Sequence, residues 1–278
     1  MSNIMDGKSL SLEIQEEVKR QIKYEMIKPS VAVIQIGDDE ASNTYIRNKQ
    51  RACENVGIFF RYYKFDDGTP ELTIINKIKE LNNDDYVNGI IIQLPLPERY
   101  NEKRLVNQII NSKDIDGLTD INVGRLLNGK KTLVPCTPLG VMELLNKYEV
   151  NLEGKHAVIV GKGKLTGLPL IHLMLNAGAT VTVCHSRTLN LENYTKQADI
   201  LISATGLNKL ITGDMVKEGV IVVDIGINYE DGHIAGDVDF NSVSKKASLI
   251  TPVPGGVGPM TIAMLLKNVI NCYYNKKK

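Results

Sequence analysis

The sequence predicts an α/β protein with two domains, each built on a parallel β-sheet with helices on its faces. Short apolar runs alternate with amphipathic helical stretches in two successive series, which is the pattern of strands buried on both faces. Between the series, Pro135 and Pro138 lie three residues apart and stop any helix that enters from upstream. A chain of 278 residues is long enough for one large domain or two small ones.

The first series begins with an amphipathic helix predicted over residues 7–26. Its apolar positions Leu10, Ile14, Val18 and Ile22 recur at helical spacing and form one stripe. Strands follow at residues 31–36, 59–65 and 89–94, and helices are predicted between them at residues 41–56 and 70–81.

The second series has the same alternation. A helix over residues 139–148 leads into it, and strands are predicted at residues 155–160, 180–184, 200–203 and 220–225. Helices are expected at residues 165–177 and 189–197, and a last helix at residues 260–273 follows a loop rich in Gly and Pro.

Composition excludes several classes of function. Lys plus Arg number 33 and Asp plus Glu number 32, so the formal charge of +1 argues against nucleic acid as the main partner. No apolar run approaches the roughly 18 residues of a membrane span, and the N-terminus lacks a secretory pattern. The 4 cysteines are far apart, so neither a metal site nor a disulfide framework is expected, and a cytoplasmic protein is predicted.

A glycine-rich turn follows the strand at residues 155–160. Gly161, Gly163 and Gly167 have the spacing GxGxxxG and open the next helix. Glycines let the backbone approach a pyrophosphate, and the helix start offers free N–H groups. The spacing is one residue longer than the usual dinucleotide fingerprint, so on its own it fits a plain strand–helix turn equally well.

The end of the next strand favours NADP over NAD. An NAD site usually has an Asp or Glu there for the ribose 2′-hydroxyl, whereas this strand continues into His185, Ser186, Arg187 and Thr188. A hydroxyl and cations suit a 2′-phosphate. The alternative is that Ser186 caps the following segment and Arg187 is an ordinary surface residue.

Tyr45 and Lys49 are four residues apart and share one face of the helix predicted at residues 41–56. A lysine beside an apolar stripe is usually a surface residue whose stem covers that stripe. Taken alone, the pair therefore carries no functional assignment.

Seven motifs, taken together and in order, resemble the bifunctional methylenetetrahydrofolate dehydrogenase/methenyltetrahydrofolate cyclohydrolase family over nearly the whole chain. They are YIRNK (45–49), GIIIQLPLP (89–97), KDIDG (113–117), PCTP (135–138), TVCHS (182–186), DIGIN (224–228) and TPVPGGVGP (251–259).

The resemblance implies a fold and a reaction. A three-layer folate-binding catalytic domain at residues 1–137 would be joined by the C-terminal helix 259–278, and a Rossmann-like NADP-binding domain would cover residues 138–258, with the cleft between the two. The family oxidises 5,10-methylenetetrahydrofolate to 5,10-methenyltetrahydrofolate and hydrolyses that to 10-formyltetrahydrofolate. A homodimer acting on tetrahydrofolate one-carbon derivatives is also implied.

The catalytic residues implied by the resemblance are Lys49, Gln93, Tyr45 and Asp116. A neutral lysine amine can take a proton from the attacking water, and the Gln93 amide can orient that amine without adding charge. Tyr45 offers a ring face to the pterin. The Asp116 carboxylate suits the two adjacent N–H donors of the pterin edge, although an Asp before Gly is more often only a turn residue.

The resemblance also implies two wider sets of contacts. Substrate-binding residues would be Tyr45, Lys49, Ile92, Gln93, Leu94, Asp116, Pro254, Gly255, Gly256, Val257 and Gly258. Cofactor-binding residues would be Gly161, Lys162, Gly163, Ser186, Arg187 and Ile227.

One departure from the family pattern bears on the cofactor. Family members commonly carry Arg-Ser after the first glycine of the phosphate turn, and this chain has Lys162 and Gly163 there. Lysine lacks the two-pronged grip of arginine on a phosphate. NADP remains the expected cofactor, with NAD as the alternative. The competing functions are an NAD-dependent or largely monofunctional member of this family, an amino-acid or shikimate-type dehydrogenase, and a non-enzymatic dinucleotide sensor.

Overall fold

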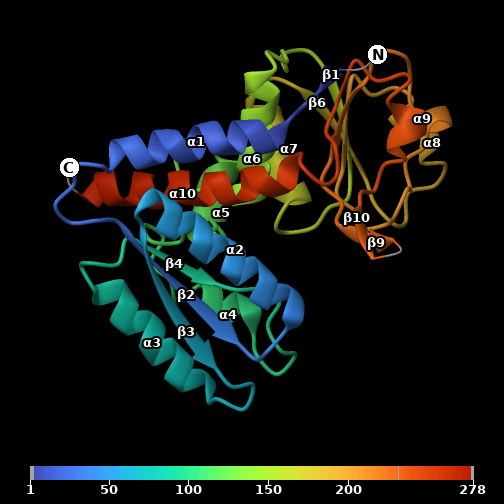
Figure 1. Ribbon diagram of the computed structural model, residues 1–278. Coiled ribbons are helices and arrows are strands. Elements are labelled where there is room, and N and C mark those ends of the chain that lie inside the picture. The colour runs from blue at the N-terminus through green and yellow to red at the C-terminus, as the bar shows by residue number, and fades with distance from the viewer. Residues whose placement is uncertain (1–2, 231, 277–278) are drawn as a thin grey trace. The chain divides into compact units, whose positions relative to one another are not determined.

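The computed structural model describes residues 3–230 and 232–276 and divides into two compact units (Figure 1). Unit 1 comprises residues up to Ser11 together with Thr137–Thr261. Unit 2 comprises Leu12–Cys136 and the chain from Ile262 onward. Each unit contains a parallel sheet, so the predicted two-domain α/β class is confirmed.

The sheet of unit 2 has three parallel strands. They are β2 (Ser30–Ile36), β3 (Phe59–Phe65) and β4 (Gly89–Ile92), in the order β3-β2-β4. All residues of the central strand β2 are buried, whereas those of the edge strand β3 alternate between exposed and half-buried. This difference follows from position, because a central strand is covered on both faces and paired along both edges.

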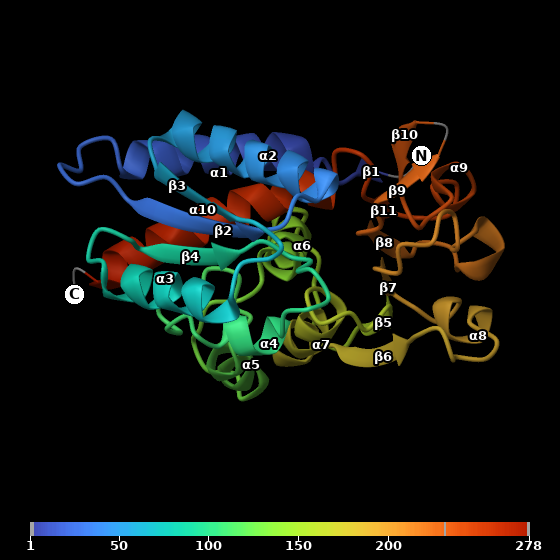
Figure 2. The ribbon, with the colours of Figure 1, turned by 90° about the horizontal axis from the view of Figure 1, so that it is seen from below.

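Two helices cover the faces of this sheet, as Figure 2 shows. α3 (Glu71–Asn83) packs its isoleucines against one set of alternating strand residues, Ala32, Ile34 and Ile36 among them. α2 (Glu40–Val56) buries Ile46, Cys53 and Val56 instead, outside that cluster. The Asp39 side chain accepts a hydrogen bond from the backbone N–H of Ser42 and so caps the start of α2.

The remaining helices of unit 2 are shorter or continue from unit 1. α4 (Glu102–Val106) and α5 (Asp120–Leu127) are only one to two turns long, and neither was predicted from the sequence. α1 (Gly7–Gln21) and α10 (Val257–Lys276) run through both units. Within unit 2 the ends of α1 and α10 lie side by side, since the hydroxyl of Tyr274 donates to the carbonyl of Gln21 at 3.0 Å.

The sheet of unit 1 has six strands, and all of its pairings are parallel. Their order is β1-β11-β8-β7-β5-β6, with β1 (Asn3–Ile4), β5 (His156–Val160), β6 (Thr180–Cys184), β7 (Ile200–Ser203), β8 (Ile221–Asp224) and β11 (Leu249–Ile250). The strands β5, β6, β7 and β8 confirm the four predicted ones to within a residue at each end. The two-residue strands β1 and β11 were not predicted, because two residues carry no periodic pattern.

Helices and a hairpin complete unit 1. The helices are α6 (Cys136–Lys147), α7 (Gly167–Asn176), α8 (Glu192–Thr195) and α9 (Phe240–Val243), with a 3₁₀ turn η1 (Gly213–Met215) and an antiparallel hairpin of β9 (Asn228–Glu230) and β10 (His233–Ala235). Three predicted helices are shorter than expected. The first ends at Gln21 rather than residue 26, the one predicted from residue 165 begins at Gly167, and the one predicted at residues 189–197 is the single turn Glu192–Thr195. In the part of the chain that the structure describes, no helix combines the length and apolarity needed to cross a bilayer.

The Lys113 side chain holds the end of α3 in place. Its buried Nζ donates hydrogen bonds to the carbonyl oxygens of Leu81, Asn82 and Asp84 at 3.0, 2.7 and 2.8 Å. The last carbonyls of a helix have no partner within the helix. Burial lowers the pKa of Lys113, and the charge of Lys276 acts in the same direction.

Replacing Lys113 by Met should lower the free energy of unfolding by about 2–3 kcal/mol, because one buried and two half-buried carbonyls lose their donor. Chemical denaturation followed by circular dichroism measures the change. Lys79→Met, at an exposed position of α3, is the control and should stay within about 0.5 kcal/mol. Equal stability of the two variants would contradict this role of Lys113.

Candidate functional site

In unit 2 the structure brings Lys49 and Gln93 together. Lys49 is on α2 and half-buried, and its Nζ donates to Oε1 of Gln93 at 3.0 Å. Gln93 follows β4, is 9% exposed, and donates from Nε2 to the carbonyl of Leu94 at 2.8 Å. Its backbone N–H donates to the carbonyl of Ile34 at 2.8 Å, which extends the pairing of β4 with β2. The amide is therefore fixed on both sides and presents its oxygen to the amine.

Asp116 belongs to the same cluster. Desolvation by burial raises the pKa of the Asp116 carboxyl, the positive charge of Lys49 opposes that shift, and Asp114 adds to it. The charge of Lys49 therefore acts on the Asp116 carboxyl within unit 2. Tyr45, one helical turn before Lys49, is 44% exposed. Ile92, at the end of β4, is buried, and Leu94 is half-buried.

Cys136 and Asn268 lie beside the segment that carries Asp116, and neither was predicted as a site residue. The Sγ of Cys136 lies 3.6 Å from Oδ1 of Asp116 and 3.8 Å from the carbonyl of Ile115. Asn268 of α10 is 3% exposed, and its Nδ2 donates to the carbonyls of Ile115 at 2.8 Å and Val134 at 3.1 Å. The buried amide thus fastens the segment before Asp116 to the segment before Cys136. Asparagine within an apolar helix was the only sequence signal.

The glycine turn of unit 1 is packed too closely for side chains at two of its three glycines. Gly161 has a φ of +114°, and a Cβ there would lie 2.2 Å from the carbonyl oxygen of Ala204. A Cβ at Gly167 would lie 2.1 Å from the carbonyl oxygen of Gly161. At Gly163 a Cβ would meet nothing within 4 Å. Lys162 and Gly163 are both exposed.

The turn that follows β6 lies beside the glycine turn. The backbone N–H of Gly161 donates to the carbonyl of Cys184, the last residue of β6, at 2.9 Å. The next residues form a compact loop in which His185 N–H donates to the Thr188 hydroxyl at 2.9 Å and Thr188 N–H returns to the His185 carbonyl at 2.8 Å. Ser186 and Arg187 are exposed at its tip. Exposed Arg187 and Lys162 next to a close-packed glycine turn fit a phosphate-bearing cofactor.

Ile227 lies in the loop that follows β8 and is 45% exposed. Parallel strands end at one edge of a sheet, and ligands of such sheets bind outside that edge. The loops after β5, β6 and β8 therefore gather the predicted cofactor residues of unit 1 at one edge.

The segment 254–258 belongs to unit 1, whereas Lys49 and Asp116 belong to unit 2. Its turn is held by a hydrogen bond from the N–H of Gly256 to the carbonyl of Pro252 at 2.8 Å. A Cβ on Gly7 would lie 1.9 Å from the carbonyl oxygen of Gly256, so the start of α1 packs directly on this segment. Gly256 and Val257 are buried, whereas Pro254 and Gly258 are exposed.

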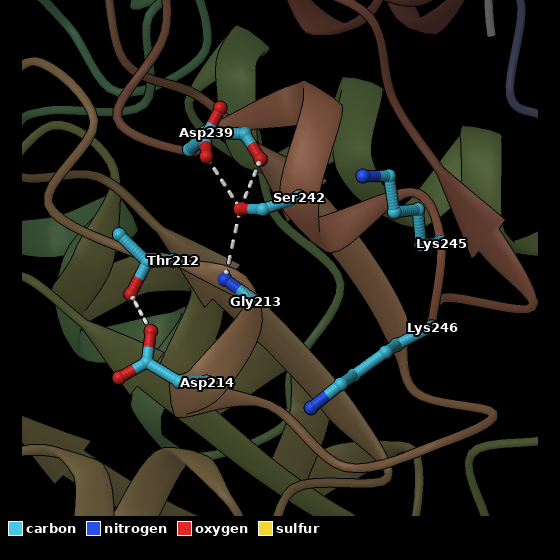
Figure 3. A pocket seen from close by; sticks show the side chains of 7 residues that line it. All are labelled: Thr212, Gly213, Asp214, Asp239, Ser242, Lys245 and Lys246. Atoms are coloured by element: carbon cyan, nitrogen blue, oxygen red, sulfur yellow. Dashed lines mark hydrogen bonds between the residues drawn. The ribbon is translucent and has the colours of Figure 1, made fainter.

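A hollow of about 460 Å³ in unit 1 includes none of the predicted residues. Figure 3 shows that its polar groups pair with one another: the hydroxyl of Thr212 donates to Asp214, and that of Ser242 donates to Asp239 and accepts from the N–H of Gly213. Two lysines complete the lining. Because its hydroxyls and carboxylates are already paired, we assign it no ligand.

Comparison with known proteins decides the family. Residues 5–116 match the model of the tetrahydrofolate dehydrogenase/cyclohydrolase catalytic domain, and residues 135–277 match the NAD(P)-binding domain of the same family. The chain belongs to the tetrahydrofolate dehydrogenase/cyclohydrolase family. The predicted resemblance is therefore confirmed, and the chain is an enzyme of this class.

Similar proteins cover the whole length. The bifunctional protein FolD of Campylobacter jejuni is 51% identical over an alignment of 278 positions. The alignment covers 98% of this chain and 99% of that protein. The crystal structure of the C. jejuni bifunctional FolD enzyme has a TM-score of 0.97 at 50% identity and covers 99% of this chain and 100% of its own. The Trypanosoma brucei FolD structure, complexed with NADP cofactor and an inhibitor, has a TM-score of 0.95 at 33% identity and covers 100% and 99%.

Asp224, the last residue of β8, gives unit 1 a pH-dependent stability. Burial raises the pKa of its carboxyl from 3.8 to about 6, although three backbone N–H groups, those of Asp237, Val238 and Gly226, act in the opposite direction. The folded state thus binds this proton more tightly than the unfolded chain. Its stabilising contribution is complete below pH 3.8 and is lost as the pH rises through about 6.

The stability of the wild-type protein relative to Asp224→Asn should fall by about 3 kcal/mol between pH 4 and pH 7, because the amide does not titrate. Urea denaturation at several pH values measures both proteins under the same conditions. A difference in stability that stays constant over this range would show that Asp224 does not titrate as described.

Proposed function

We propose that this enzyme oxidises 5,10-methylenetetrahydrofolate to 5,10-methenyltetrahydrofolate with NADP and then hydrolyses the product to 10-formyltetrahydrofolate. The observation that carries the proposal is the group formed by Lys49, Gln93 and Asp116 in unit 2. It combines an amine, a neutral amide that orients it and a buried carboxyl, and the hydrolysis needs no further catalytic side chain. Unit 2 would bind the folate, and the C-terminal edge of the sheet in unit 1 would bind the cofactor.

Asp116 and Tyr45 would hold the pterin for both reactions. A carboxylate accepts the two adjacent N–H donors of the 2-amino-4-oxo edge. Burial raises the pKa of the Asp116 carboxyl, so donors brought by a ligand would offset part of that desolvation. The exposed ring of Tyr45 would stack on the pterin face. Ile92 and Leu94 would line the site beside Gln93.

Lys49 would act on the water that attacks the methenyl carbon. Its neutral amine takes a proton from that water as the C–O bond forms, and the resulting hydrate opens to the 10-formyl product. Gln93 accepts a hydrogen bond from Nζ at 3.0 Å and so directs the amine without the charge of a carboxylate. A Glu in its place would stabilise the ammonium form and remove the base.

NADP is the cofactor because the turn after β6 offers Ser186 and Arg187 where an NAD site carries an acid. When bound, it accepts the hydride from the methylene bridge. Gly161 and Gly163 would receive the pyrophosphate, and Lys162 would reach the 2′-phosphate together with Ser186 and Arg187. Ile227 would contact the nicotinamide from its exposed loop.

We also propose a cytoplasmic homodimer. The edge strand β6 pairs with β5 alone among the described strands, and its residues up to Val183 remain exposed or half-buried. A second copy could cover them, as protein edges usually are covered. The four cysteines are all unpaired and buried, which suits a reducing compartment. Light scattering after gel filtration tests the dimer.

The direct test mixes the enzyme with 5,10-methylenetetrahydrofolate and NADP and follows the methenyl absorbance and NADPH together. Added 5,10-methenyltetrahydrofolate, without any nicotinamide, tests the hydrolysis by itself. The proposal requires both signals. NADPH without decay of the methenyl compound would mean a dehydrogenase alone, and no signal with either nicotinamide would reject the function.

Lys49→Met should lower the rate of methenyltetrahydrofolate hydrolysis by about 10²- to 10⁴-fold, because the proton acceptor is lost. The affinity for NADP, measured by calorimetry, should change little, since Lys49 belongs to unit 2. Lys79→Met again serves as the control. Parallel losses of hydrolysis and cofactor affinity would count against the assigned role.

The double substitution Lys162→Arg/Gly163→Ser should tighten NADP binding by roughly threefold to tenfold and NAD binding by less, because arginine grips a phosphate with two hydrogen bonds. The serine side chain has room, since a Cβ at position 163 meets nothing within 4 Å. Dissociation constants for both nucleotides provide the measurement. An equal gain for NADP and NAD would show that residue 162 does not meet the 2′-phosphate.

A further inference from the structure

Asp237 is a fully buried carboxylate in unit 1 to which the chemistry above gives no role. Its Oδ2 accepts hydrogen bonds from the Ser203 hydroxyl at 3.0 Å and the backbone N–H of Thr205 at 2.6 Å. Its Oδ1 accepts from the backbone N–H of Leu207 at 3.1 Å and from Nδ2 of Asn228 at 3.2 Å. All four partners are donors, so this side chain acts only as an acceptor.

The four donors come from two loops at the C-terminal edge of the sheet. Ser203 ends β7, and Thr205 and Leu207 lie in the loop that follows it. Asn228 closes the loop that follows β8. The carboxylate also touches the second loop directly, since a Cβ at Gly226 would lie 2.1 Å from Oδ1 of Asp237. One side chain therefore joins the loop 204–207 to the loop 225–228.

These loops are in turn joined to the glycine turn. The carbonyl oxygen of Ala204 is the atom that excludes a side chain at Gly161, and the N–H of Ala204 donates to the carbonyl of Val160 at 2.8 Å. A shift of the loop 204–207 would therefore displace the turn proposed to receive the pyrophosphate. In the other loop, exposed Ile227 stands between Gly226, whose N–H donates to Asp224, and Asn228, whose amide donates to Asp237.

We propose that Asp237 is a positioning residue of the cofactor site: its buried carboxylate holds the loops 204–207 and 225–228 in the conformation that receives the nicotinamide half of NADP. The inference rests on the proposed function, because it takes the C-terminal edge of unit 1 as the cofactor site. Loops that are already ordered lose less conformational freedom on binding, so the effect of Asp237 lies in affinity and not in chemistry.

The test compares Asp237→Asn with Asp214→Asn. An asparagine offers one acceptor oxygen and turns its NH₂ toward two of the four donors, so the loops are released. Asp214 is an exposed carboxylate of the same unit that pairs with Thr212 in the hollow of Figure 3. Asp237→Asn should raise the dissociation constant for NADP at least about tenfold and accelerate amide exchange in both loops. Asp214→Asn should change neither.

The rate of methenyltetrahydrofolate hydrolysis without nicotinamide distinguishes a local effect on the cofactor loops from a general loss of folded protein. The residues proposed for hydrolysis, Lys49, Gln93 and Asp116, are in unit 2, whereas Asp237 is in unit 1. This rate should stay within about twofold of wild type in Asp237→Asn. Unchanged NADP affinity, or a parallel loss of affinity and hydrolysis, would overturn the inference.

Two milder variants decide the question if Asp237→Asn does not fold. Ser203→Ala and Asn228→Ala each remove one donor, and each should weaken NADP binding by roughly threefold, again with hydrolysis retained. No change in either variant would also overturn the inference. Failure of the proposed function is a different result: the wild-type enzyme itself would then neither bind NADP nor reduce it with methylenetetrahydrofolate.

Discussion

The hydrogen bond between Lys49 and Gln93 is the interaction on which the proposed chemistry of unit 2 depends. It joins α2 to the residue that follows β4, so the pairing of β4 with β2 determines where the Lys49 amine lies. The backbone N–H of Gln93 donates to the carbonyl of Ile34, which fixes the backbone from which the side chain extends. The hydrogen bond from Nε2 to the carbonyl of Leu94 then holds the amide that orients the amine. A proposed base held in this way is positioned before the substrate arrives.

Asp116 is also positioned by its neighbours, although the groups differ from those around Lys49. Its segment is fixed from behind by Asn268 and flanked by Cys136, both of which are neutral. Burial leaves the carboxyl desolvated and raises its pKa, and the charge of Lys49 opposes that rise. In the proposed complex, two N–H donors of the pterin would offset part of the cost of burying this carboxyl.

The sequence was sufficient for the strands and long helices, because their apolar spacing is local. β7 is an example, since Ile200–Ser203 was predicted with the same ends that the structure gives it. The short helix α5 and the two-residue strand β11 carry no comparable signal, and their positions depend on the rest of the unit. The contact of Asn268 with Ile115 joins residues 153 positions apart. Spacing along the chain contains no information on such a pair, and neither the resemblance nor the motifs pointed to it.

In unit 1, buried carboxyl groups fix the loops at the edge of the sheet. Asp224 and Asp237 are buried next to each other. The Asp237 carboxylate accepts from backbone and side-chain donors of the loops that follow β7 and β8. The Asp224 carboxyl accepts from the backbone N–H of Gly226 after β8 and from those of Asp237 and Val238 after β10. Loops at the edge of a parallel sheet have no strand to pair with, so their N–H groups need acceptors from elsewhere. A carboxylate accepts more hydrogen bonds than any neutral side chain, and it can therefore fix several loops at once. In unit 1 these two buried carboxyl groups therefore order backbone at the edge of the sheet where the cofactor is proposed to bind.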